Sequence, residues 1–125
     1  MAEPFSYAVL RLVPDIERGE SINVGVLVFC RPRDFLGART ALDEVRAGAL
    51  GGDVDLEAAR RHLAAIERIA RGDPEAGPIA ALDTTGRFHW LAAPASTIVQ
   101  ASEVHTGLCD DPGACLDELF ERLVR

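Results

Sequence analysis

The chain has 125 residues, of which 48% are hydrophobic and 26% charged, a composition typical of a globular protein rather than a disordered one. This length suits one domain with a substantial core, so residues 1–125 are expected to form a single domain. The net charge of -7 argues against general binding to nucleic acid or to an anionic membrane, because both need a positive surface.

The chain contains three cysteines, Cys30, Cys109 and Cys115. The odd number, together with a start that lacks a basic segment followed by an apolar one, favours reduced thiols in a cytoplasmic protein. The longest apolar run is also too short to cross a bilayer.

The first third of the chain predicts three strands of an antiparallel sheet. Residues 5–13 alternate loosely, and a polar loop separates them from residues 20–31, so these segments are expected to form a hairpin. The second segment is apolar on both faces, as is typical of a central strand. One face is expected to hold Ile22, Val24, Val26 and Val28, and the other Leu27 and Phe29. Residues 35–41 predict a short third strand.

Helices are expected after these strands. Residues 43–50 predict one or two helical turns, and a long helix then follows a cap at Asp53 or Asp55 and ends at Gly72. Apolar residues recur along it at spacings of three and four, namely Leu56, Ala59, Leu63, Ile66 and Ala70. A final helix is expected to begin at Pro112, after an aspartate cap.

Between the two long helices, residues 88–91 and 96–101 are expected to be extended, on either side of a turn at Pro94. The elements together predict an α+β fold, with a mainly antiparallel sheet and two principal helices packed against it.

Reactive side chains are densest between Glu103 and Asp111. Cys109 close to the positive end of the last helix would have a lowered pKa, and His105 would be its base. The favoured alternative is a structural loop, in which Thr106 and Gly107 turn the chain and Cys109 packs in the core, because no third residue orients the pair.

Asn23 and Gly25 interrupt the second face of the central strand. Glycine inside a strand marks a bulge or the close approach of another backbone, and a buried asparagine needs hydrogen-bond partners. We expect Asn23 to meet the His105–Cys109 segment, so that the sheet and the last helix share one polar spot. The alternative is that Asn23 only braces the loop at His105–Cys109 through hydrogen bonds.

A second candidate site is a ligand-binding wall around the aromatic residues 88–91. In it Trp90 would stack on a ligand, His89 and Gln100 would form hydrogen bonds, and Arg31 or Arg87 would hold an anion. The alternative, that these aromatic residues fill the core, is favoured because they bury the most area per residue.

Metal sites are not predicted. Zinc ligands would have to come from His105, Cys109, Cys115 and Cys30, which lack the closely spaced cysteine pairs of structural zinc sites. Magnesium held by Asp110 and Asp111 is also not expected, because adjacent residues rarely point to the same place. No cofactor is expected.

Five segments in order resemble the DUF3037 family, bacterial proteins of unknown function. They are residues 7–11, 18–26, 88–91, 96–100 and 105–112. The family has no established activity, cofactor or catalytic residue, so the resemblance assigns no site. Members of the family are often encoded beside a protein resembling a HipA-like kinase, and the resemblance therefore implies such a kinase as a partner.

The expected function is that of a non-catalytic interaction or accessory protein, whose acidic surface meets a basic surface of a partner. The alternative is a small enzyme or ligand-binding domain with a polar pocket around Asn23 and His105–Cys109.

Overall fold

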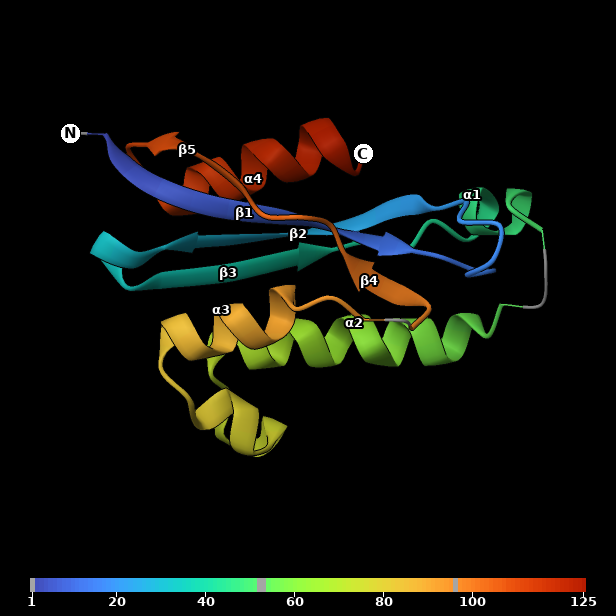
Figure 1. Cartoon of the computed structure of the whole chain (residues 1–125), viewed down its shortest axis with the longest axis horizontal. Coiled ribbons are helices and arrows are strands. Elements are labelled where there is room, and N and C mark those ends of the chain that lie inside the picture. The colour runs from blue at the N-terminus through green and yellow to red at the C-terminus, as the bar shows by residue number, and fades with distance from the viewer. Residues whose placement is uncertain (1, 52–53, 96) are drawn as a thin grey trace.

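Our computed structural model describes residues 2–51, 54–95 and 97–125. Across these residues an antiparallel sheet of five strands forms the middle layer, with helices on both faces (Figure 1). The strands are β1 (Glu3–Leu12), β2 (Ile22–Cys30), β3 (Phe35–Thr40), β4 (Val99–Ala101) and β5 (His105–Cys109). β2 lies between β3 and β1, and the other side of β1 pairs with both β4 and β5. The predicted α+β class, the hairpin and the central position of β2 are confirmed.

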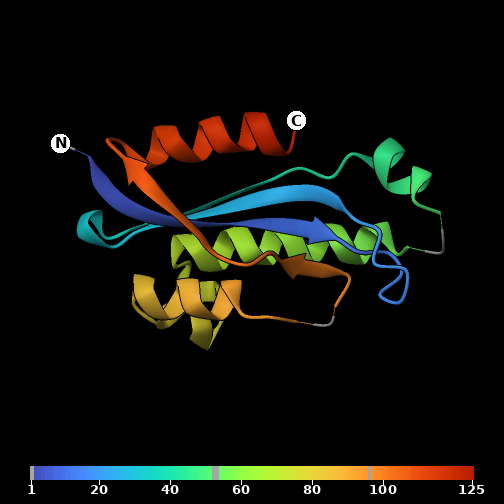
Figure 2. The same ribbon diagram turned by 45° about the horizontal axis from the view of Figure 1, so that its top comes forward.

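Four α-helices are present in the described ranges: α1 (Glu44–Ala49), α2 (Leu56–Arg71), α3 (Thr84–Ala92) and α4 (Pro112–Leu123). α4 covers one face of the sheet, and α2 and α3 cover the other (Figures 1 and 2). The predicted start of α4 is confirmed, because the Asp111 carboxylate accepts hydrogen bonds from the Gly113 and Ala114 amides. Within the described ranges, every helix is too short or too polar to span a lipid bilayer.

The caps of α2 are also confirmed where they are described. Asp55 accepts a hydrogen bond from the Ala58 amide, and Gly72 ends the helix with a positive φ of 71°. The other candidate cap, Asp53, lies outside the described residues.

A β-bulge in β2 changes which side chains share a face. Leu10 pairs with Gly25 and Arg11 pairs with Asn23, so Val24 is an extra residue without an opposite partner. As a result Val24 packs in the core under α2, whereas Val26 packs in the core under α4. The prediction of one shared face for the four β-branched residues of β2 was wrong, because the bulge reverses the alternation.

Gly25 lies where the neighbouring strands leave no room for a side chain. A Cβ there would be 2.8 Å from the Arg39 carbonyl oxygen and 2.9 Å from Leu10 Cδ1. Both expectations for a glycine in this strand are therefore met, since it adjoins a bulge and lets another backbone approach.

The prediction of an extended segment at residues 88–91 was wrong, because these residues belong to α3. The Asp83 carboxylate caps this helix by accepting a hydrogen bond from the Gly86 amide. Phe88 and Leu91, three residues apart, both face the core, and the Phe88 ring stacks on Phe29 with centroids 4.9 Å apart. Of residues 96–101, only Val99–Ala101 form a strand, and Ser96 lies outside the described residues.

The predicted loop at His105–Cys109 was also wrong, because this segment is strand β5. Gly107, taken as a turn residue, lies opposite Phe5 of β1 instead. A Cβ at Gly107 would be 2.8 Å from Phe5 Cε1, so glycine leaves room for the aromatic ring between the strands and α4.

Candidate functional site

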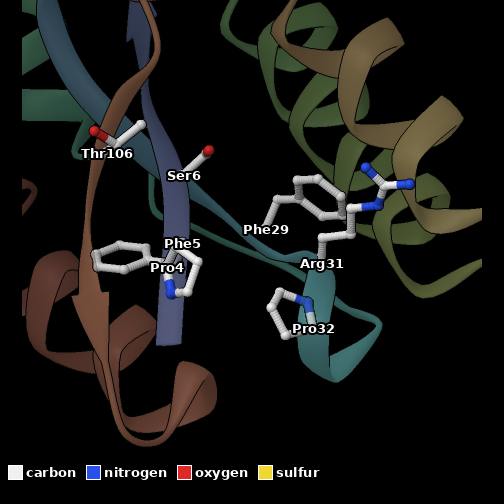
Figure 3. A pocket seen from close by; sticks show the side chains of 7 residues that line it. All are labelled: Pro4, Phe5, Ser6, Phe29, Arg31, Pro32 and Thr106. Carbon is white, nitrogen blue, oxygen red and sulfur yellow. The ribbon is translucent and has the colours of Figure 1, made fainter. Parts of the chain in front are cut away.

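Part of the sheet face that carries α2 and α3 is hollow at the end where β1 begins (Figure 3). This hollow has a volume of about 610 Å³, and we call it the β1–β5 groove. The residues that line it are Pro4, Phe5, Ser6, Phe29, Arg31, Pro32 and Thr106. Its wall is mainly apolar, so its most natural occupant is an apolar side chain.

Three polar side chains border the β1–β5 groove. Ser6 and Thr106 are direct cross-strand partners, so their hydroxyl groups lie on the same face. Arg31 is exposed, and Figure 3 shows its side chain reaching from the end of β2 toward the helices. No hydrogen bond or ion pair ties its guanidinium to another residue of the described ranges. The groove therefore offers one free cation beside an apolar surface.

Strand β5 forms an open edge beside this groove. Among the described strands it pairs only with β1, whereas the edge strand β3 is packed between α2 and α4. Leu108 of β5 is 72% exposed and Val104, just before the strand, is 44% exposed. An edge with unpaired backbone groups and exposed apolar side chains is a template for an added strand.

Cys109 and His105 do not form a nucleophile and base. Cys109 is buried, and burial, helped by the neighbouring thiols of Cys30 and Cys115, raises its pKa to about 11. His105 is four residues away on the same strand, a separation of roughly 13 Å at 3.3 Å per residue. Cys109 thus packs in the core, as the packing alternative predicted, and its pKa is raised rather than lowered.

His105 contacts other groups instead. Its ring lies 5.2 Å from the ring of Tyr7, and its Nε2 lies 3.5 Å from the Glu103 carboxylate. His105 and Thr106, two of the predicted site residues, are both exposed on β5.

Asn23 does not meet the His105–Cys109 segment. It pairs with Arg11 on one side of β1, whereas His105 pairs with Tyr7 on the other side. The expected shared spot with that segment and the bracing alternative were therefore both wrong.

Asn23 instead caps the C-terminal end of the last helix. Its Nδ2 donates to the Leu123 carbonyl at 2.9 Å, and Arg46 of α1 donates to the Val124 carbonyl at 2.9 Å. These two donors satisfy carbonyl groups that the C-terminus of α4 leaves without helical partners. The arrangement is a helix cap built from distant parts of the chain.

The structure brings together two residues of the predicted ligand-binding wall and separates the others. Trp90 and Gln100 line one pocket of about 380 Å³, which we call the Trp90 pocket. Its lining comprises Leu10, His62, Ile66, Trp90, Leu91, Ala93, Pro94, Ala95, Thr97, Val99, Gln100 and Ala101. His89 is exposed on α3 and does not line it, Arg31 lies in the β1–β5 groove, and Arg87 donates to the Leu82 carbonyl.

The sequence interpretation missed His62, which faces this pocket from α2. A signal was present, since His62 lies four residues before Ile66 and therefore on the border of the apolar stripe of α2. A polar aromatic residue at that border is positioned to line a pocket beneath the helix.

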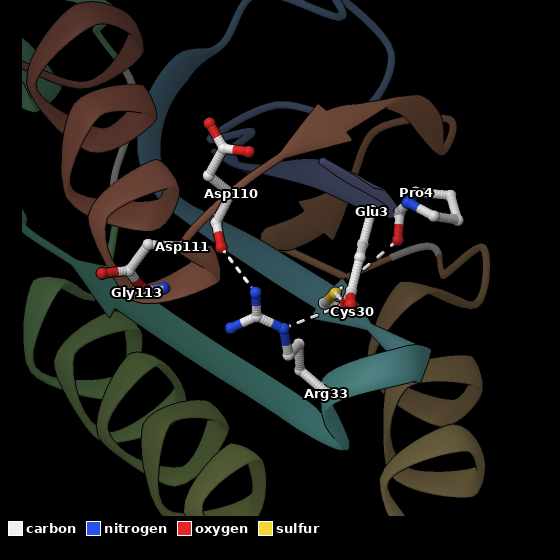
Figure 4. Close-up of polar contacts among 7 residues, drawn as sticks. All are labelled: Glu3, Pro4, Cys30, Arg33, Asp110, Asp111 and Gly113. Carbon is white, nitrogen blue, oxygen red and sulfur yellow. Dashed lines mark hydrogen bonds and ion pairs between the residues drawn. The ribbon is translucent and has the colours of Figure 1, made fainter. Parts of the chain in front are cut away.

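A polar cluster closes the end of the molecule near residue 3 (Figure 4). Arg33 donates from Nε to the Glu3 carboxylate at 3.0 Å and from Nη2 to the Asp110 carbonyl at 2.8 Å. The Cys30 thiol donates to the Pro4 carbonyl, with sulfur and oxygen 3.6 Å apart. The cluster thus joins the start of β1, the β2–β3 turn and the β5–α4 turn.

All three cysteines are free thiols. Cys30 and Cys109 lie in the core under α4, and Cys115 packs beside them. In the described part of the chain, no three histidine, cysteine, aspartate or glutamate side chains are grouped so that they could hold a metal ion.

We predict that native Cys109 resists alkylation at neutral pH, because its raised pKa leaves almost no thiolate and burial excludes the reagent. Half-buried Cys115, whose pKa is also raised by burial, should react before Cys109. Mass spectrometry should find all three thiols alkylated after denaturation without reductant. A disulfide, or a stoichiometric zinc signal that Cys109→Ser removes, would contradict this prediction.

The same pKa shift links stability to alkaline pH. The pKa of Cys109 is raised from 9.0 to about 11 in the folded protein. The contribution of the neutral thiol to the free energy of unfolding is therefore fully present below pH 9.0. That contribution is lost as the pH rises through about 11, because the unfolded thiol ionises first.

Comparison with known proteins adds a family but no activity. Residues 7–124 match the family model described as Protein of unknown function (DUF3037). No curated protein and no solved structure matches the chain. Because the match covers nearly all of the 125 residues, from β1 to the end of α4, the chain belongs to the DUF3037 family.

Proposed function

We propose that the protein is a non-catalytic accessory protein that binds a partner through the edge of β5 and the β1–β5 groove. The observation that carries this proposal is the exposure of Leu108, 72%, on a strand whose outer edge is open. An extended segment of a partner can hydrogen-bond to that edge while its alternate side chains reach the groove.

The groove and its surroundings define the chemistry of the partner segment. An apolar side chain fits against Phe29 and Pro32, and a carboxylate of the partner fits the guanidinium of Arg31. Acidic residues flank β5, with Glu103 before it and Asp110 after it, so basic residues at both ends of the segment would complement them.

A second copy of this chain fits the β5 edge less well. Antiparallel pairing of two β5 edges sets the acidic residue before one strand, Glu103, near Asp110 after the other strand. Like charges placed opposite each other destabilise such a pair. The proposed occupant is therefore a segment of another protein.

The HipA-like kinase that the family resemblance implies is the first partner to test. The site of action we propose is the bacterial cytoplasm, which suits three free thiols. The net charge of -7 favours a protein partner over nucleic acid or a membrane surface.

The prediction is that the protein co-purifies after coexpression with a HipA-like kinase of the kind encoded beside members of the family. Leu108→Asp should abolish co-purification, because the carboxylate would be desolvated in the interface, and Arg31→Glu should weaken it by reversing the groove charge. Hydrogen exchange should show new protection of the β5 amides in the complex.

Ile16→Asp is the matched control, because Ile16 is also exposed, at 53%, but lies in the β1–β2 loop at the other end of the sheet (Figure 1). It should leave binding unchanged. Failure of the wild-type proteins to co-purify would refute the kinase as partner. Co-purification that tolerates Leu108→Asp would refute the β5 edge as the binding surface.

A further inference from the structure

We infer that the Trp90 pocket binds an uncharged, planar ring compound that carries a hydrogen-bond donor. This inference goes beyond the proposed protein partner, since the Trp90 pocket and the β1–β5 groove share no lining residue. Its walls come from β1, α2, α3, β4 and residues 93–95 and 97 between α3 and β4.

Trp90 is unusual among the apolar residues of α3. Phe88 and Leu91 are 3% and 8% exposed, whereas Trp90 is 51% exposed and lines the hollow. The prediction that the aromatic residues fill the core therefore holds for Phe88 and fails for Trp90. A half-exposed indole above an apolar floor offers a flat face on which another ring can stack.

The floor of the pocket is apolar and already formed. Leu10, Ile66, Leu91 and Val99 are all less than 9% exposed, so they belong to the core and do not need to rearrange. The volume of about 380 Å³ falls in the range of small-molecule sites, roughly 300–1,000 Å³. One or two fused rings fit a site of this size.

The polar groups of the pocket are held in place by the chain itself. Gln100 Nε2 donates to the Thr97 carbonyl at 2.8 Å, and the Thr97 hydroxyl donates to the Val99 carbonyl at 2.6 Å. With its amide nitrogen engaged in this way, Gln100 retains its side-chain oxygen as an acceptor. A ligand that donates a hydrogen bond matches this acceptor.

The charge of the lining distinguishes this pocket from other hollows. Among the described residues, its lining contains no arginine, aspartate or glutamate, and His62 is the one titratable residue. By contrast, Arg31 borders the β1–β5 groove, and Arg60, Arg68 and Arg71 border a hollow between β3 and α2. Because a charged ligand would lose solvation here without gaining a counter-charge, the occupant is uncharged.

The test uses the single tryptophan of the chain, whose indole N–H gives one signal in a ¹⁵N–¹H NMR spectrum. The full-length protein is titrated with uncharged planar heterocycles, led by adenine and nicotinamide, and with the anion nicotinate as the charged counterpart. The expected result is a saturable shift of the Trp90 signal with neutral compounds and none with nicotinate. No saturable shift with any neutral compound, or an equal shift with nicotinate, would overturn the inference.

Variants then assign the contacts, with binding read from ligand-detected saturation transfer. Trp90→Ala should abolish binding, Trp90→Phe should keep it, and Gln100→Leu should weaken it roughly tenfold, the effect of about 1.4 kcal/mol for one lost hydrogen bond. Leu108→Ala is the control and should bind as the wild type does. Unchanged binding in Trp90→Ala, with an unchanged melting temperature, would also overturn the inference.

Discussion

Replacing Val26 with aspartate is expected to unfold the protein. Val26 is 0% exposed in the central strand, paired with Val9 on one side and Arg39 on the other, and it packs in the core under α4. An unpaired carboxylate there costs several kcal/mol, comparable with the whole stability of a small domain, about 5–15 kcal/mol. Circular dichroism should show loss of the cooperative thermal transition.

Val45→Asp provides the matched control, because the same chemical change occurs at a side chain that is 84% exposed on α1. Its melting temperature should stay close to that of the wild type. A soluble Val26→Asp protein with an unchanged melting temperature would show that β2 is not the central strand.

Replacing Phe120 with alanine is expected to lower the free energy of unfolding by about 3–5 kcal/mol, as is typical for a buried phenylalanine. Phe120 is 1% exposed between α4 and the sheet. The guanidinium groups of Arg39 and Arg125 lie 4.2 Å and 5.6 Å from the centre of its ring, so the substitution also removes two cation–π contacts. Urea denaturation measures the loss.

Two further variants show whether packing is responsible. Phe120→Leu keeps most of the apolar volume and should lose less stability than the alanine variant. Glu121→Ala, one residue further and exposed, should change stability little. A loss below about 1 kcal/mol in Phe120→Ala would contradict the placement of α4 against the sheet.

The sequence predicted only those parts of the candidate sites whose residues lie close together in the chain. The sequence predicts that Trp90 and Gln100 belong to one ligand-binding wall, and the structure brings them together in one pocket. His62 joins them from α2, about thirty residues earlier in the chain, and no local spacing connects it to Trp90. The β5 edge was not predicted, because a strand edge exists only once pairing is known.

The sequence by itself determined the elements whose signals are local. Period-two and helical spacing identify β2, α2 and α4, and the caps Asp55 and Asp111 are confirmed, because side-chain periodicity and backbone hydrogen bonding act within a few residues. α3 was missed although Asp83 caps it, since an aromatic segment has strand propensity and packing against Phe29 is a distant contact.

Only the tertiary structure decided which residues meet across the sheet. Strand β1 makes the contacts that matter most here. It pairs with β2 on one side and with β5, about a hundred residues later in the chain, on the other. That pairing places His105 beside Tyr7 and leaves Asn23 to cap α4. The bulge at Val24 likewise depends on the register between strands. Such pairings arise from contacts distant in sequence, so neither periodicity nor residue spacing contains them.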